Sequence, residues 1–152
     1  MAKESLQTQK DRPVVHLMGL KNLKTLRFWN TKIADAGLVH LQGLTSLTNL
    51  SLFDTKISDA GLVHLKGLTS LQRLCFNQTQ ITDTGLLQLK GLTKLEKLDL
   101  SETKITDAGL EHLKELTNLK TLNLSKLYPN TKITDAGVVE LQKALPNCEI
   151  NR

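Results

Sequence analysis

A repeat of 24 residues constrains this chain more than any other feature of its sequence. One leucine per unit marks the period, at Leu20, Leu44, Leu68, Leu92 and Leu116. A fixed period between about 20 and 50 residues is the signature of a solenoid. Because a single unit cannot bury its own leucines, the units must stack against one another.

Each unit divides into two patterns, which the third unit illustrates. Residues 71–76, LQRLCF, have a leucine spacing that ends in alternation, and this predicts a short strand with one buried face. Residues 59–65, DAGLVHL, carry leucines three apart and predict a short helix. An aspartate begins each helical part and is expected to cap free amide donors there; these aspartates are Asp35, Asp59, Asp83, Asp107 and Asp135.

A threonine follows each predicted strand, at Thr31, Thr55, Thr79 and Thr103. The chain bends there, and a short hydroxyl can both donate to and accept from backbone groups that the bend leaves without partners. We expect these threonines to form an internal ladder. Simple β-propensity at a strand end is the alternative explanation.

The spacing resembles the leucine-rich repeat family, whose pattern is LxxLxLxxNxL, with Thr here in the Asn position. The resemblance covers roughly residues 11–152, and the ITDAGL half of the unit is similar to repeats in bacterial members. It implies an α/β fold: a right-handed βα superhelix, or solenoid, with parallel strands on the concave face and short helices on the convex face.

One domain is expected from 152 residues. We predict a flexible tail over residues 1–10 and a repeat domain over residues 11–152. That domain comprises a half repeat, five repeats with extra residues at 126–130, and a short closing strand within residues 147–151. The half repeat has no strand of its own, so the strand near residues 25–29 has an open edge. The edge could continue a longer array, pair with another copy, or lie under the tail.

Composition narrows the classes of partner. The net charge of +5 comes from 20 basic and 15 acidic residues spread along the chain, which does not indicate a nucleic-acid footprint. No apolar run has the length of a membrane span, and the start lacks the apolar core of a signal peptide. We therefore expect no nucleic-acid or membrane partner and a cytoplasmic location, unless the chain is part of a longer protein.

Strand positions that point away from the core should form a binding surface, because they vary between units while the core positions do not. Trp29 and Phe53 hold the same position in adjacent units, and Arg27 and Arg73 lie nearby. Exposed aromatics with arginine are typical of binding hot spots. Packing of the aromatic pair under the tail, or against a missing unit, is the alternative. The predicted protein-binding residues are Arg27, Trp29, Asn30, Phe53, Asp54, Arg73, Asn77, Lys97 and Asp99.

Two rows mark the helical side. The histidines His16, His40, His64 and His112 recur in one position, but duplication explains them, and no Cys or carboxylate completes a zinc site. An apolar row opposite the core leucines comprises Val15, Val39, Val63, Leu87 and Val139. Regular helices would expose this row as a possible interface. Tighter or tilted helices would leave it partly buried, which we expect.

The sequence has no glycine-rich phosphate loop, metal-spaced cluster or nucleophile–base pair. We expect no enzyme activity, no cofactor and no metal. The favoured function is protein binding through the concave face, by a monomer or weak homo-oligomer. The alternative is a structural segment of a longer array, or a unit that self-associates through its open N-terminal edge.

Overall fold

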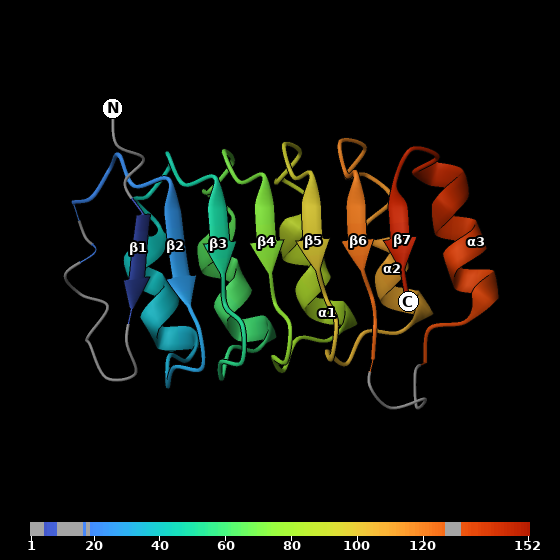
Figure 1. Ribbon diagram of the computed structural model, residues 1–152, viewed down its shortest axis with the longest axis horizontal. Helices are drawn as coiled ribbons and strands as arrows, with labels where there is room; N and C mark the ends of the chain where they lie inside the picture. Colours follow the sequence, from blue (N-terminus) through green and yellow to red (C-terminus); the bar gives the residue numbers. More distant parts are fainter. Residues whose placement is uncertain (1–4, 9–16, 18, 127–131) are drawn as a thin grey trace.

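The computed structural model describes residues 5–8, 17, 19–126 and 132–152. The described strands form one parallel sheet in chain order, with short helices behind it (Figure 1). The strands are β1 (Ser5–Thr8), β2 (Thr25–Phe28), β3 (Asn49–Ser51), β4 (Arg73–Cys75), β5 (Lys97–Asp99), β6 (Thr121–Asn123) and β7 (Glu149–Asn151). This is the predicted α/β leucine-rich solenoid.

The core is a stack of leucines in register. Leu50 pairs with Leu74, and Leu74 pairs with Leu98, so successive units lie in consecutive layers. Each of these three side chains is 2% exposed. Ile150 pairs with Leu122 and packs against the core, which confirms the predicted closing strand.

Short helices return the chain to the next strand. They are η2 (Asp35–Leu41), η3 (Asp59–Leu65), α1 (Asp83–Leu86), η4 (Leu87–Leu89), α2 (Asp107–Glu111) and α3 (Asp135–Ala144). η2, η3 and η4 are 3-10 helices, in which residues three apart lie in line along the axis. Leu62 and Leu65 in η3 therefore point the same way, into the core, and both are fully buried. No helix in the described ranges has both the length and the apolar character needed to cross a membrane.

The aspartates that begin these helices connect neighbouring repeats. Asp59 does not cap its own helix; it accepts hydrogen bonds from the backbone N–H and the hydroxyl of Thr82, with an N–Oδ1 distance of 2.8 Å. The same pair of bonds joins Asp35 to Ser58, Asp83 to Thr106, and Asp107 to Thr134. The prediction that the aspartates cap their own helices is therefore wrong for these four.

In four repeats, the glycine two residues after the aspartate makes room for this connection. A Cβ at Gly61 would lie 2.5 Å from Oδ1 of Asp35, and one at Gly85 would lie 3.0 Å from Cγ of Asp59. Gly109 and Gly137 face Asp83 and Asp107 in the same way. The Asp-x-Gly pattern thus connects two repeats. The aspartate of one repeat accepts hydrogen bonds from the following repeat, and the glycine of that following repeat leaves space for the carboxylate.

The threonines after the strands are buried and bond within their own repeat. The hydroxyls of Thr55 and Thr79 donate to the carbonyls of Leu52 and Phe76, at 2.7 and 2.6 Å. Thr103 bonds to Leu100 in the same way. The Thr31 hydroxyl is buried without a partner among the described residues. The predicted role of satisfying bend carbonyls therefore holds for three threonines and not for Thr31.

The N-terminal edge differs from the sequence-based expectation. Ser5–Thr8 forms β1, which pairs in parallel with β2 along four residues. The edge of β2 is thus covered by a segment that we predicted to be part of a flexible tail. The rest of that tail and the half repeat at residues 11–16 lie outside the described residues, as do residues 127–131 of the predicted insertion.

Candidate protein-interaction face

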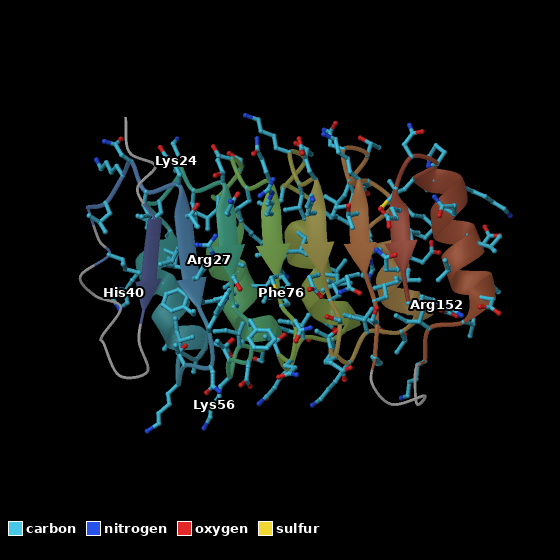
Figure 2. All side chains as sticks on the ribbon, viewed as in Figure 1. Lys24, Arg27, His40, Lys56, Phe76 and Arg152 are labelled. Carbon is cyan, nitrogen blue, oxygen red and sulfur yellow. The ribbon has the colours of Figure 1, made fainter. Side chains whose placement is uncertain are left out.

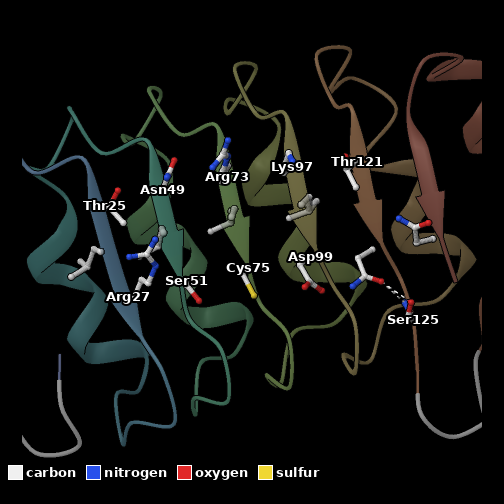
Figure 3. A pocket seen from close by; sticks show the side chains of 16 residues that line it. Thr25, Arg27, Asn49, Ser51, Arg73, Cys75, Lys97, Asp99, Thr121 and Ser125 are labelled. Carbon is white, nitrogen blue, oxygen red and sulfur yellow. Dashed lines mark hydrogen bonds between the residues drawn. The ribbon is translucent and has the colours of Figure 1, made fainter. Parts of the chain in front are cut away.

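Strands β2 to β7 line a groove of about 580 Å³ on the face of the sheet opposite the helices (Figure 3). Strands β2 to β6 each contribute side chains two residues apart, and β7 contributes Asn151; these side chains form rows across the sheet because neighbouring strands are in register. We call the rows by position. The first row is Thr25, Asn49, Arg73, Lys97 and Thr121. The second row is Arg27, Ser51, Cys75, Asp99, Asn123 and Asn151.

A third row continues just beyond the strand ends. The inter-strand ladder extends there, since the N–H of Asn30 donates to the carbonyl of Phe53, and that of Asp54 donates to the carbonyl of Asn77, both at 3.0 Å. Trp29, Phe53 and Asn77 therefore occupy adjacent positions, as predicted.

Trp29 is fixed over the sheet. Its side chain is 52% exposed, and its indole N–H donates to the Ser51 hydroxyl at 3.0 Å. Phe53, in the next repeat, is partly buried. One polar contact thus orients a large aromatic surface that remains half open to solvent.

Two cations lie side by side in the first row. Arg73 pairs with Lys97 across β4 and β5, and both are exposed. Figure 3 shows the two side chains at the same edge of the groove, and Figure 2 places Arg27 over the face of the sheet. Within the described ranges, no salt bridge involves Arg73 or Lys97.

Asp99 is already engaged by its own repeat. One carboxylate oxygen accepts from the backbone N–H of Ser101 at 2.9 Å and also from its hydroxyl. The Asn77 amide donates to the same hydroxyl. The matching turn at Asn123 receives the N–H and hydroxyl of Ser125, at 3.1 and 2.7 Å. Sequence reasoning missed this network, although Asp and Asn side chains commonly accept from the backbone N–H two residues later in turns.

Asn30 and Asp54 have a structural role that the sequence analysis did not foresee. Their φ angles are both 49°, in the left-handed region, as are those of Gln78 and Glu102 at 56° and 54°. Asn and Asp tolerate this region better than most residues. The two residues line a second, smaller groove along the loop edge of the sheet, apart from the first two rows. The structure therefore separates them from Arg27, Arg73, Lys97 and Asp99.

Cys75 lies in the groove, but its thiol is a weaker candidate nucleophile than an ordinary cysteine. Burial, with a smaller effect of the nearby Asp99 carboxylate, raises the pKa of its thiol. A raised pKa reduces the thiolate fraction at neutral pH, and the thiolate is the nucleophile. Cys148, at the far end of the core, also has a raised thiol pKa because of burial.

The apolar row on the convex side is exposed to solvent. Val39, Val63, Leu87 and Val139 are between 40% and 54% exposed. η2 and η3 are tight 3-10 helices, as we expected, but the expectation that tight helices would leave the row partly buried is wrong, because these four side chains are exposed. Val15 lies outside the described residues. Among the histidines, His64 contacts the Gln42 amide at 2.8 Å, and no group of three metal-ligating side chains occurs in the described part of the chain.

Sequence comparison identifies the family. The profile of leucine-rich repeats in two copies matches residues 69–112 and 93–147, and a single-repeat profile matches residues 43–65. The chain belongs to the leucine-rich repeat family. Leucine-rich repeat proteins are generally scaffolds for interactions and are not usually enzymes. No curated protein sequence matches this chain.

Similar solved structures are bacterial leucine-rich repeat proteins. Internalin C2 of Listeria monocytogenes is 28% identical over 93% of this chain, with a TM-score of 0.71. The internalin inlF of the same organism is 23% identical over 97% of the chain, with a TM-score of 0.64. A leucine-rich repeat protein of Leptospira interrogans is 22% identical over 98%, with a TM-score of 0.73. The chain spans 55%, 47% and 37% of these three proteins.

Proposed function

We propose that this leucine-rich repeat domain binds a protein partner through the concave groove and the adjoining third row, with Trp29 and Phe53 at the centre of the contact. The observation that carries the proposal is the orientation of Trp29, half exposed and held over β3 by Ser51. A rigid aromatic surface loses little conformational entropy on binding, which is why such residues dominate binding hot spots.

Family membership supports an interaction module, and the residue pattern supports this face. Core positions are apolar in every repeat, whereas groove positions change from repeat to repeat. The scaffold does not require the groove residues, so their identity is free to serve recognition. Of the predicted residues, Arg27, Arg73, Lys97 and Asp99 line the groove itself. Asn30 and Asp54 have the weaker case, because the left-handed turn accounts for them.

Affinity capture with the purified domain tests the proposal. The variant Trp29→Ala plus Phe53→Ala should lose partners that the native chain retains, because it removes the aromatic surface without opening the leucine core. Val39→Ala plus Val63→Ala is the matched control, since it deletes exposed apolar groups on the convex side. Captured proteins would be identified by mass spectrometry and re-measured in purified form. Equal affinity of the native and Trp29/Phe53 variants for every captured protein would rule out the concave site.

A structural role within a longer array is the second candidate. It is favoured by one observation: the similar solved proteins extend well beyond the length of this chain. Self-association through the N-terminal edge would now have to involve β1, because β1 pairs with β2. Light scattering across a concentration series separates this candidate from the first. A concentration-dependent dimer that Ser5–Thr8 deletion abolishes would support it, and a monomer at all concentrations would exclude self-association.

A further inference from the structure

The groove has an unbalanced charge that bears on the chemistry of its partner. Its lining includes the cations Arg27, Arg73 and Lys97 and a single carboxylate, Asp99. Arg73 and Lys97 form no salt bridge among the described residues, and Asp99 is the one carboxylate that lines the groove with them. Outside the groove, by contrast, Lys90 forms a salt bridge with Glu115 and Lys120 forms one with Glu96, at 3.0 and 3.1 Å.

The one carboxylate does not neutralise the cation pair. Oδ1 of Asp99 accepts both the N–H and the hydroxyl of Ser101, so its position is set by the turn. Asp99 belongs to the second row, whereas Arg73 and Lys97 belong to the first. Two like charges in directly opposite positions of adjacent strands are unfavourable, and an external anion would relieve that repulsion.

We propose that the groove binds an acidic protein segment, with two neighbouring carboxylates over Arg73 and Lys97 and an apolar side chain against Trp29 and Phe53. This inference rests on the proposed function and specifies the partner class for the same face. Guanidinium and ammonium groups both form charge-assisted hydrogen bonds with carboxylates. A nucleic acid fits less well, because binding to a phosphate backbone draws on many Lys and Arg contacts, and the first row supplies only Arg73 and Lys97.

The geometry also sets a spacing within the segment. The Trp29–Phe53 pair and the Arg73–Lys97 pair are two strands apart across the sheet and four residues apart along it. With about 4.8 Å between strands and about 3.3 Å per residue, the two contacts lie about 16 Å apart. An extended segment covers that distance in about five residues, so the apolar residue and the acidic pair should be separated by about that number.

Selection from a displayed library of random 12-residue peptides tests the inference. Peptides selected on the native domain should carry paired Asp or Glu about five residues from a Trp, Phe or Leu. A synthetic copy of a selected peptide would then be measured by fluorescence polarisation. Arg73→Glu plus Lys97→Glu should weaken its binding at least tenfold, and raising NaCl from 50 to 500 mM should weaken binding to the native domain, because salt screens exposed charges.

Lys66→Glu plus Lys94→Glu is the matched control. Both lysines are exposed and lie outside the groove lining, and the net charge changes by the same amount. Binding should stay within about twofold of native. Equal losses in the two charge-reversed variants would mean that overall charge matters and the groove does not, which would overturn the inference.

The outcomes separate this inference from the proposed function. Selected peptides that lack acidic residues, yet lose binding in the Trp29→Ala plus Phe53→Ala variant, would overturn the acidic partner and leave the concave site standing. Peptides insensitive to both variants would overturn both. A 20-nucleotide oligothymidine that binds more tightly than the best peptide, through Arg73 and Lys97, would instead assign the groove to nucleic acid.

Discussion

The carboxylate of Asp59 receives both the backbone N–H and the hydroxyl of Thr82 from the next repeat, with an N–Oδ1 distance of 2.8 Å. Gly85, on the following helix, has no side chain at the point where Asp59 crosses into that repeat. The four helix starts at Asp35, Asp59, Asp83 and Asp107 are tied in this way to the next repeat by polar contacts, in addition to the apolar stack. Solenoid stability depends on such interfaces between neighbours.

We predict that Gly85→Ala destabilises the domain by about 1–3 kcal/mol, because the new methyl group would collide with Asp59. Gly91→Ala is the control: a Cβ there meets nothing within 4 Å, so its effect should be small. Urea unfolding followed by circular dichroism measures both.

The cause of that loss can be checked with a double-mutant cycle. Asp59→Ala alone should cost about 1–3 kcal/mol, because it leaves the Thr82 donors without their acceptor. Combined with Gly85→Ala it should cost clearly less than the sum, since the clash disappears with the carboxylate. Strict additivity would show that the two residues act independently.

Core truncation should depend on position in the stack. Leu74→Ala, at a 2% exposed central position, should cost about 2–5 kcal/mol. Ile150→Ala should cost less, because Ile150 is only partly buried in β7 and has a core layer on one side. If denaturant melts showed the same loss of unfolding free energy for both variants, stability would not be a sum of contacts between neighbouring repeats.

The threonine series gives a third comparison. Thr79→Val should cost about 1 kcal/mol, because the Thr79 hydroxyl bonds to the Phe76 carbonyl in the buried bend. Thr31→Val should be neutral or stabilising, since its buried hydroxyl has no partner in the described structure. Thermal melts of the two variants would test this; a larger loss for Thr31→Val would contradict the assignment.

Trp29 is the single tryptophan, so its fluorescence reports the groove directly. Ser51→Ala removes the acceptor of the indole N–H, and the steady-state anisotropy of the emission should fall as the ring gains freedom. Ser70→Ala, in a loop outside the groove lining, should leave the anisotropy unchanged. An unchanged value in Ser51→Ala would show that the contact does not hold the ring.

Cys75 should react slowly with iodoacetamide at neutral pH. Burial raises the pKa of its thiol, so the reactive thiolate forms at a higher pH than it does in an ordinary, exposed cysteine. Mass spectrometry of the Cys75 peptide across pH 7–10 would measure the rate, with glutathione as reference. If Cys75 were alkylated faster than glutathione at pH 7, the raised thiol pKa would be contradicted.

Much of this architecture could be predicted from local pattern. The 24-residue period specified which leucines face inward, because a fixed repeat permits only one stacking register; Leu50, Leu74 and Leu98 lie where that register requires. The same register correctly made Trp29 and Phe53 neighbours. Position within a repeat was also enough to assign Arg73 and Lys97 to the exposed side of the strands.

Other features depended on contacts that one repeat makes with the next. The aspartates were predicted to be helix caps because each lies at the start of a helix. Their carboxylate oxygens instead accept hydrogen bonds from a threonine or serine 23 to 27 residues later in the chain. Pairing of Ser5–Thr8 with β2 could not be read from a segment that lacks the repeat pattern. Periodicity determined the stack because burial of leucine is a property of each unit. Tertiary structure alone decided the polar connections, because their donors and acceptors belong to different repeats.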